Sequence, residues 1–564
     1  MSNNKNTLTG AQAMVRMLEA HGVTHVFGLC GDTSLPFYDA LYQLKPNIRH
    51  ILARDERSAA YMADAYARVT GKVGVCEGPS GGGATYIAPG LAEANDSSIP
   101  VLAITTDVAT TAHGHYPLTE LDQPALFAPL TKFCASIDQA GQLPSMLRTA
   151  FRAMTTGKPG AAHLAFPTDV QNAPVDAGEI WAQPEHGRYP AWRIAPPADT
   201  ARAMATALAG ASRAVLICGG GVVISGAESE LSRLAERLDA VVATTISGQG
   251  SLPETNPNCL GVVGSNGGVA QTRALVEAAD LVMFIGCRAG AVTTEKWQVP
   301  PQGTPILHLD IDPMVISATY PTQVAMVADA RAGLAAINAE LDGIEFLPGD
   351  GAARIAPAVA AKLANFEKLA ASEATPIRPE RVVKTLNNLL DPDAIVVTDP
   401  GTPCPYFSAY YPIREAGRTF ISNRAHGALG YSMAAAIGAH IGRPAVKTVA
   451  IMGDGSFGFT VGELETAARL GLPITFIVLT NASFGWIKAG QKTSFGGRYF
   501  SVDFSATDHA KIAGAYGIKS WRVEAPGELQ PALEAALGAS GPTLVDIVVQ
   551  PLQDASAPVS EWMV

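Results

Sequence analysis

The feature that most constrains the fold is a repeated alternation of short, nearly continuous apolar runs with longer helical patterns. The apolar runs cover residues 23–29, 73–78, 101–105, 161–167, 214–221, 240–245, 281–287, 306–312, 394–401, 448–455, 474–481 and 543–550. Strands of this kind are typical of parallel sheets that are covered by helices on both faces. We therefore predict an α/β fold of three doubly wound domains with mostly parallel sheets.

Two stretches have the composition of linkers between such domains. Residues 178–198 are rich in proline, tryptophan and charge. Residues 345–378 begin with the turn LPGDG, continue in a helical segment and lead into the next domain through the proline-containing EATPIRPE. The length of 564 residues also exceeds what one hydrophobic core usually organises. We predict domains at 1–180, 198–345 and 376–564.

Charge and cysteine content exclude several classes of function. The net charge is −11 and no basic run follows the pattern of a nucleic-acid-binding surface, so we expect no nucleic acid partner. Seven scattered cysteines without a CxxC pair argue against a zinc site or a disulfide framework. No apolar run reaches the roughly 18–20 residues that span a bilayer, and the first residues do not resemble a signal peptide. We expect a cytoplasmic protein with no membrane partner.

The most informative stretch is TVAIMGDGSFGFTVGELETAARLGLPITFIVLTNASFGW, residues 448–486. One predicted strand ends at Asp454 and is followed by a helix that runs to Leu470, and the next strand ends at Asn481. Parallel strands deliver both oxygen-bearing side chains to the same edge of the sheet. A hard cation such as Mg²⁺ prefers oxygen ligands and is often completed by phosphates. The neighbouring glycines and the helix N-terminus favour a diphosphate.

This arrangement resembles the GDG…N signature of thiamine-diphosphate-dependent enzymes, especially the acetolactate synthase-like group. The resemblance implies that Asp454, Asn481 and the backbone carbonyl of Ser483 hold Mg²⁺, which in turn holds the diphosphate. The further cofactor contacts that it implies in this region are Gly453, Gly455, Ser456, Phe484, Gly485 and Trp486.

Two more segments resemble cofactor-binding parts of that family. The turn TDPGTP, residues 398–403, is similar to the turn on the other side of the diphosphate, with contacts at Gly401 and Thr402. The stretch AHGALGYSMAAAIGA, residues 425–439, is similar to the segment that cradles the middle of the cofactor. There Gly427 is expected to offer its carbonyl to the aminopyrimidine, and Leu429 to bend the cofactor into a V shape.

Residues 50–71 resemble the segment that carries the glutamate of the family, which places this carboxylate at Glu56. Such a glutamate hydrogen-bonds the pyrimidine ring nitrogen and so promotes removal of the thiazolium C2 proton. With further matches at residues 27–41 and 77–105, the resemblance covers essentially the whole chain. It implies that the first domain binds the pyrimidine, the second is nucleotide-binding-like and the third binds the diphosphate. It also implies a homodimer or homotetramer with the active site between subunits.

Some residues depart from the pattern of acetolactate synthases. A glutamine position is occupied by Thr119, and it is preceded by His113 and His115, which are candidates to protonate an intermediate or bind a substrate carboxylate. A tryptophan position is occupied by Gly490. Lys488 either pairs with an anionic substrate or points to solvent. These departures favour substrates other than those of branched-chain amino-acid synthesis.

The central domain leaves its cofactor open between FAD, another nucleotide such as ADP or coenzyme A, and none. Residues 218–221 form a glycine turn of the kind found in nucleotide-binding relatives. However, Ser265 and Asn266 stand where FAD-binding relatives have Met-His, and AGAVTT follows Arg288 where they have a flavin-contacting FDDR.

We predict a thiamine-diphosphate- and Mg²⁺-dependent enzyme that forms or cleaves a C–C bond next to a carbonyl. The leading hypothesis is an acetolactate synthase-like decarboxylating carboligase that acts on a 2-oxo acid. The alternative is a decarboxylase or lyase that acts on a 2-oxo acid or on a 2-hydroxyacyl or oxalyl thioester. A remote alternative is a homologue that binds the cofactor but is catalytically silent.

Overall fold

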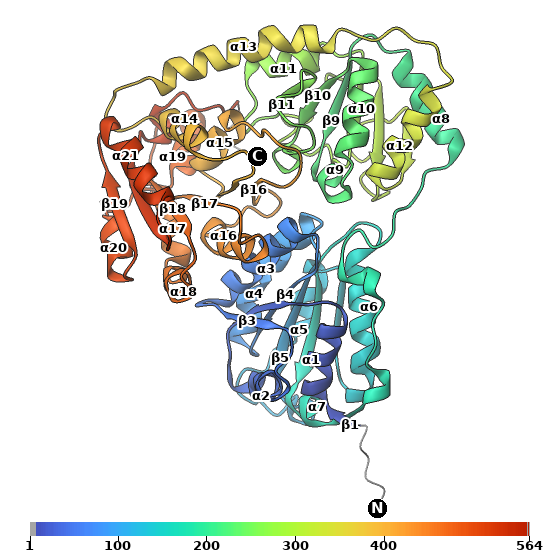
Figure 1. Ribbon diagram of the computed structural model, residues 1–564, viewed down its shortest axis with the longest axis vertical. Coiled ribbons are helices and arrows are strands. Elements are labelled where there is room, and N and C mark those ends of the chain that lie inside the picture. Colours follow the sequence, from blue (N-terminus) through green and yellow to red (C-terminus); the bar gives the residue numbers. More distant parts are fainter. Residues whose placement is uncertain (1–6, 561, 563–564) are drawn as a thin grey trace, which may run out of the picture. The chain divides into compact units, whose positions relative to one another are not determined.

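The structure, a computed structural model, describes residues 7–560 and 562 and contains three six-stranded parallel sheets (Figure 1). In addition, a short antiparallel pair joins β1 (Thr7–Thr9) to β8 (Pro174–Asp176). The predicted α/β class with three doubly wound, mostly parallel sheets is confirmed.

The first sheet combines partly exposed edge strands with central strands that are almost entirely buried. Its order is β3 (Arg49–Leu52), β2 (His25–Gly28), β4 (Gly74–Gly78), β5 (Val101–Asp107), β7 (Ala162–Pro167) and β6 (Phe133–Ser136). Its helices are α1 (Gly10–Ala20), α2 (Leu35–Leu44), α3 (Glu56–Thr70), α4 (Gly82–Asp96), α5 (Gln123–Phe127), α6 (Leu143–Thr155) and α7 (Thr168–Asn172). Alternate residues of β4 face opposite ways, since Val75 joins the core with α1 and α6 while Gly74 and Gly78 lie against α3 and α4.

The central sheet has the order β11 (Cys259–Val262), β10 (Val241–Thr244), β9 (Ala214–Cys218), β12 (Leu281–Ile285), β13 (Ile306–Asp310) and β14 (Val324–Val327). Its helices are α8 (Ala198–Ala209), α9 (Gly220–Ser225), α10 (Glu228–Leu238), α11 (Ala270–Glu277), α12 (Ala330–Leu341) and α13 (Gly351–Ala370). Alternate residues of its strands enter two separate cores, one with α8, α10 and α12 and the other with α11 and α13. The sheet is therefore covered on both faces, which explains its continuous apolar runs.

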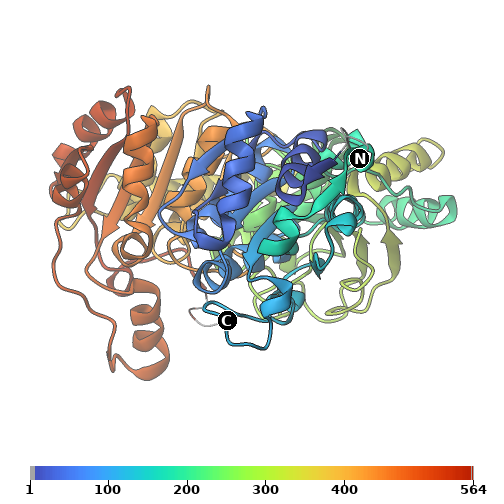
Figure 2. The ribbon, with the colours of Figure 1, turned by 90° about the horizontal axis from the view of Figure 1, so that it is seen from below.

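The last sheet has the order β16 (Phe420–Ser422), β15 (Ile395–Thr398), β17 (Thr448–Gly453), β18 (Ile474–Thr480), β20 (Thr543–Val548) and β19 (Lys519–Val523). The helices of this part of the sequence are α14 (Pro379–Leu389), α15 (Pro403–Tyr410), α16 (Tyr431–Gly442), α17 (Asp454–Thr460), α18 (Glu463–Leu470), α19 (Gly485–Phe495), α20 (His509–Ala515) and α21 (Pro526–Leu537), which Figure 2 shows in orange and red. The helix predicted through Glu463 to Leu470 is present as α18, and it is preceded by a separate short helix, α17. The two are interrupted at Val461 and Gly462, which are both poor helix formers.

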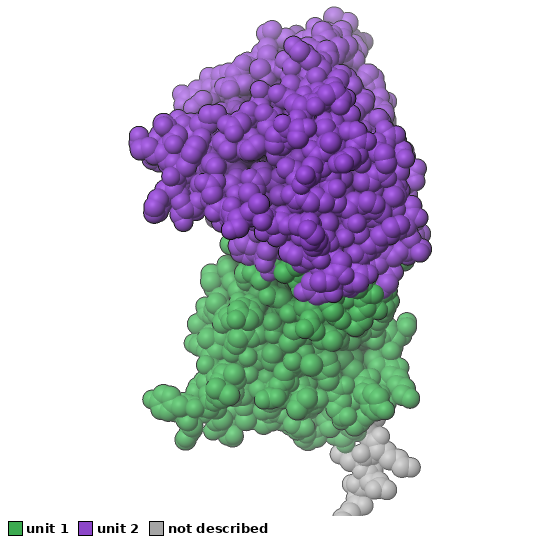
Figure 3. Space-filling model, turned by 90° about the vertical axis from the view of Figure 1, so that its left-hand side faces the viewer, with its two compact units in different colours: residues 1–192, 425–444, 460–470 green, residues 193–424, 445–459, 471–564 purple. Residues whose placement is uncertain are grey.

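The chain divides into two compact units that are not continuous in sequence (Figure 3). The first contains residues 1–192, 425–444 and 460–470, and the second contains 193–424, 445–459 and 471–564. The domain boundaries at 180, 198, 345 and 376 stay a prediction. Among the described residues, none of the helices combines the length and apolar character needed to cross a membrane.

Within the first unit, α16 packs closely against α3. A Cβ atom at Gly438 would lie 2.0 Å from the Met62 carbonyl oxygen. We expect Gly438→Ala to destabilise the folded protein by about 1–3 kcal/mol, because the added methyl group forces the two helices apart. The thermal unfolding midpoint of the full chain measures this effect.

Gly514, in α20, provides the matched control for this substitution. A Cβ atom there meets nothing within 4 Å. Gly514→Ala is therefore expected to be neutral or to stabilise the protein by up to about 1 kcal/mol through helix propensity. Equal unfolding midpoints for the two variants would show that the packing at Gly438 is not tight.

Candidate active site

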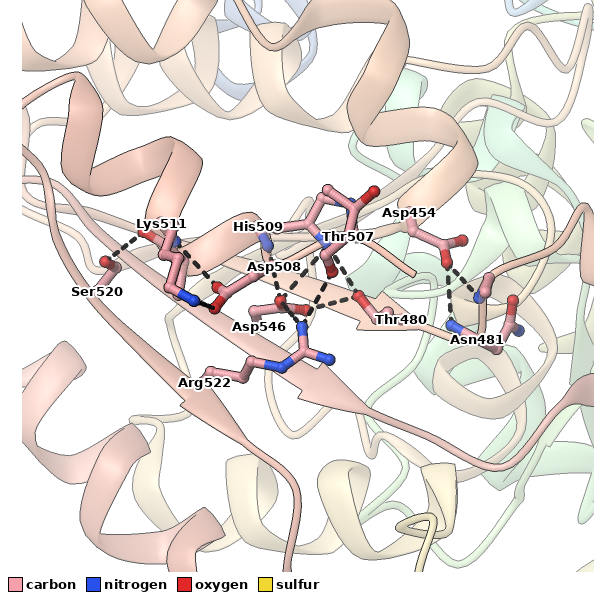
Figure 4. Close-up of polar contacts among 12 residues, drawn as sticks. Asp454, Thr480, Asn481, Thr507, Asp508, His509, Lys511, Ser520, Arg522 and Asp546 are labelled. Carbon is pink, nitrogen blue, oxygen red and sulfur yellow. Dashed lines mark hydrogen bonds and ion pairs between the residues drawn. The ribbon is translucent and has the colours of Figure 1, made fainter. Parts of the chain in front are cut away.

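Two neighbouring strands bring Asp454 and Asn481 to one edge of the last sheet. In the register of β17 and β18, Gly453 lies opposite Leu479, so the two strands end at the same level of the sheet. The Asp454 carboxylate accepts the backbone N–H groups of Asn481 at 3.0 Å and Ala482 at 2.6 Å (Figure 4). It also accepts the N–H of Gly455 at 2.9 Å. The spacing read from the sequence thus corresponds to direct contact in space.

Asn481 links Asp454 to two other predicted site residues. Its side-chain oxygen accepts hydrogen bonds from the backbone N–H and the hydroxyl of Ser483, both at 3.2 Å. Its side-chain nitrogen donates to the hydroxyl of Thr402 at 3.3 Å. The structure therefore assembles the four predicted residues Thr402, Asp454, Asn481 and Ser483.

The donor set of this corner suits a hard cation. Burial raises the pKa of the Asp454 carboxyl, while backbone N–H groups of Ala482, Asn481 and Gly455 lower it. A divalent cation would favour the ionised form. In residues 7–560 and 562, no group of three or more His, Cys, Asp or Glu side chains is placed to hold a metal. A cation at Asp454 and Asn481 would thus need further oxygen ligands, which a bound diphosphate offers.

The surroundings of this corner leave space for backbone groups to approach an anion. Gly401 has a φ of +100°, which favours glycine. The helix α19 begins at Gly485, and a Cβ atom there would lie 3.1 Å from both the Asn481 side-chain nitrogen and the Thr402 hydroxyl. Because the first N–H groups of a helix lack partners within it, they attract negative charge. A Cβ atom at Gly453 would meet no other atom within 4 Å.

Two aromatic residues that follow Ser483 in the sequence pack against aromatic rings from later in the chain. The ring of Phe484 lies edge-on to the ring of Phe504. A Cβ atom at Gly455 would lie 2.9 Å from the Phe484 ring. Trp486 contacts the ring of Trp562 with 5.2 Å between centroids. Ser456 is buried.

Lys488 forms an ion pair with Asp503 at 2.5 Å. A carboxylate of the same chain therefore engages the ammonium group, which does not simply point to solvent. The pairing of Lys488 with an anionic substrate stays a prediction.

Glu56 is the first residue of α3 and is buried. The N-terminal cap of this helix is Asp55, whose side chain accepts the N–H of Arg57, so Glu56 is free of the capping role. Its side chain lies over two glycines, where Cβ atoms at Gly78 and Gly83 would approach it to 3.2 and 2.9 Å.

Burial is the main cause that raises the pKa of Glu56, and the negative charges of Asp55 and Glu77 add to it. The N–H of Glu56 itself acts in the opposite direction. A buried carboxyl with a raised pKa is well suited to share a proton with a ring nitrogen.

Gly427 lies in the turn before α16 with a φ of +74°, and Leu429 is half-buried in the same turn. The side chain of Glu93 accepts the N–H of His426 at 2.8 Å and that of Gly427 at 3.3 Å. Glu93 is fully buried and pairs with Arg68 at 3.3 Å. Sequence reasoning missed Glu93, although a glutamate inside an otherwise apolar helix is itself a signal of a buried partner.

His113 and His115 lie in an exposed loop of the first unit. The His113 ring is 3.7 Å from the Asp107 carboxylate and 3.8 Å from that of Glu120. Thr119 in the same loop shares a hydrogen bond of 2.6 Å with Ser80, beside the glycine turn that faces Glu56. The role of the two histidines stays a prediction.

Comparison with known proteins identifies the family. Family models match at residues 8–126, 201–337 and 399–547, as the N-terminal binding domain, the central domain and the C-terminal binding domain of thiamine pyrophosphate enzymes. The probable acetolactate synthase large subunit of Methanococcus aeolicus is 34% identical over 559 residues, which cover 96% of this chain and 92% of that protein. The chain belongs to the thiamine-diphosphate-dependent enzyme family.

Other relatives lie in the same group of the family. The acetolactate synthase isozyme 3 large subunit of Escherichia coli is 31% identical, with 94% of this chain and 92% of that protein covered. The acetolactate synthase large subunit of Corynebacterium glutamicum is 33% identical, with 96% and 87% covered. The resemblance inferred from the sequence motifs, including the acetolactate synthase-like group and thiamine diphosphate as cofactor, is thereby confirmed.

Proposed function

We propose that this thiamine-diphosphate-dependent enzyme is a Mg²⁺-dependent carboligase that decarboxylates a 2-oxo acid and joins the remaining fragment to a second carbonyl compound. Similarity along almost the whole chain to proteins named acetolactate synthase supports this proposal. The observation that carries it is the position of Glu56, a buried carboxyl at the start of α3 whose side chain lies over Gly78 and Gly83, in the domain that matches the N-terminal thiamine pyrophosphate binding domain.

Metal binding, diphosphate binding and proton transfer are assigned to different residues of the chain. Asp454, Asn481 and the carbonyl of Ser483 would hold Mg²⁺, and the N–H groups at the start of α19 would face the diphosphate. Glu56 would exchange a proton with the pyrimidine ring nitrogen through its carboxyl oxygen. When bound, the cofactor supplies a nucleophilic carbon and accepts the electron pair that decarboxylation leaves behind.

The turn before α16 has a supporting role in this proposal. Glu93 holds the N–H groups of His426 and Gly427, which leaves the Gly427 carbonyl to accept from the aminopyrimidine. Leu429 would be the apolar wedge beneath the cofactor. We propose a homodimer or homotetramer as the working form, by analogy with the family.

The central domain carries one observation that favours a second cofactor. Asn266 is buried, and neither its side-chain nitrogen nor its oxygen has a hydrogen-bond partner within the described residues. Buried amides are normally bonded, so a ligand with polar groups would complete the site. FAD or another nucleotide is the candidate, and the absorption spectrum of the purified protein together with mass spectrometry of its released ligands tests it.

Incubation with pyruvate, Mg²⁺ and thiamine diphosphate tests the proposed reaction. Although the departures at Thr119 and Gly490 favour other substrates, the similarity to proteins named acetolactate synthase makes pyruvate the first substrate to test. With it we expect acetolactate, detected as acetoin after acidification, because the fragment left by decarboxylation attacks a second pyruvate. Release of acetaldehyde alone would identify a simple decarboxylase and contradict carboligation. Absence of turnover with pyruvate and other 2-oxo acids would contradict the substrate class.

A further inference from the structure

A buried polar cluster lies beside the Asp454–Asn481 corner, on the last three strands of the sheet. Its centre is Asp546 in the middle of β20, whose side chain is inaccessible to solvent. The Asp546 carboxylate accepts the hydroxyl of Thr480 at 2.5 Å, the backbone N–H of His509 at 2.9 Å and a guanidinium N–H of Arg522 at 2.6 Å (Figure 4). A buried carboxylate is tolerated only when it is paired and hydrogen-bonded, and three donors meet that requirement here.

The sheet explains why Thr480 and Asp546 meet. Val478 lies opposite Asp546 in the register of β18 and β20. Because side chains alternate along a strand, Thr480 points to the same face as Val478 and is the diagonal neighbour of Asp546. The Thr480 hydroxyl has one hydrogen, which it donates to Asp546, so it accepts the Nδ1–H of His509 at 3.1 Å.

The cluster contacts both chain segments that carry the candidate cation ligands. Thr480 directly precedes Asn481 in the chain. The His509 ring packs edge-on against Phe457, with 4.9 Å between centroids, and Phe457 belongs to α17, which begins at Asp454. The cluster also binds the loop before α20, because Arg522 donates a hydrogen bond to the carbonyl of Thr507 at 3.0 Å.

We propose that the Thr480–Asp546 hydrogen bond fixes the direction in which the chain leaves β18 and thereby sets the position of Asn481 relative to Asp454. Thr480 is then a positioning residue for the divalent cation, and Asp546, Arg522 and His509 hold the Thr480 side chain in place. This inference rests on the proposed Mg²⁺ site. Groups behind metal ligands commonly act in this way, and their loss weakens metal affinity by about 10- to 100-fold.

Thr480→Val tests the proposal because it keeps the shape of the side chain and removes the hydroxyl. We expect the Kd for Mg²⁺, titrated at saturating thiamine diphosphate and followed by tryptophan fluorescence, to rise by about 10-fold or more. Thr480→Ser restores the hydroxyl and is expected to restore the affinity. The thermal midpoint of the cofactor-free protein is measured for every variant.

Thr475→Val is the matched control. Thr475 lies on the same strand, and its buried hydroxyl also bonds to β20, at 3.0 Å from the hydroxyl of Thr543. The two valine variants are expected to lose similar stability, but only Thr480→Val should lose Mg²⁺ affinity. If both or neither lose affinity, the positioning role is wrong.

Two further outcomes separate this inference from the function on which it rests. If the wild-type protein binds neither Mg²⁺ nor thiamine diphosphate, the proposed cation site fails, and the positioning role fails with it. If the wild type binds both and Thr480→Val binds them equally well, only the positioning role fails. Should Thr480→Val not fold, Thr480→Ala is judged by the same affinities.

Discussion

Glu56→Gln is expected to lower kcat by about 10²- to 10⁴-fold, the usual contribution of a general acid–base group. The amide keeps the size of the side chain but cannot take up and release a proton at the pyrimidine nitrogen. Hydrogen–deuterium exchange at C2 of bound thiamine diphosphate isolates this step from substrate binding. We expect exchange to slow by a similar factor while the variant still binds the cofactor.

Glu380→Gln is the control for this substitution. Glu380 is likewise a buried glutamate in the first turn of a helix, and burial likewise raises its pKa. It belongs to α14 and touches none of the proposed site residues, so its variant should retain exchange at C2. Wild-type exchange in Glu56→Gln would refute the proton-transfer role.

Asp454→Asn is expected to weaken Mg²⁺-dependent binding of thiamine diphosphate by at least about 100-fold, because metal affinity falls that far even when only supporting groups are lost. Of the four assembled residues Thr402, Asp454, Asn481 and Ser483, Asp454 alone carries a carboxylate, which the substitution removes. It also turns an amide N–H₂ toward backbone N–H groups that now donate to the carboxylate. Titration with the cofactor at fixed Mg²⁺, followed by tryptophan fluorescence, measures the change.

Asp310→Asn controls for the loss of a buried aspartate at the end of a parallel strand. Asp310 ends β13 of the central sheet and is as buried as Asp454, with 8% of each exposed. Its variant should bind thiamine diphosphate with wild-type affinity. A similar loss in both variants would mean that general destabilisation, and not the cation, explains the result for Asp454.

The apolar runs of the sequence predict the four inner strands of each six-stranded sheet, and they miss the two outer strands. The reason is physical, because inner strands are buried on both faces and read as continuous apolar segments. Outer strands such as β3, β6 and β19 are partly exposed, and β16 has only three residues. The outer strand β11 is buried, but it has only four residues and one of them is Gly261. Such segments carry little apolar signal.

The contacts of the candidate site also divide into those that could be predicted from the sequence and those that could not. Asp454 and Asn481 could be paired from the sequence because each directly follows an inner strand, and parallel strands end together. Glu93 and Asp546 could not, because their partners lie far away in the sequence and only packing brings them close. The pairing of Lys488 with Asp503 depends on how the chain folds back after α19.

The discontinuous first unit has a consequence for how the protein is made. The helix α16 packs on α3 with its residues 431–440 buried, yet the two are separated in the chain by the whole central sheet. A ribosome therefore releases α3 long before its partner emerges. The apolar face of α3 must stay uncovered during that interval, so the first unit reaches its complete core only late in translation.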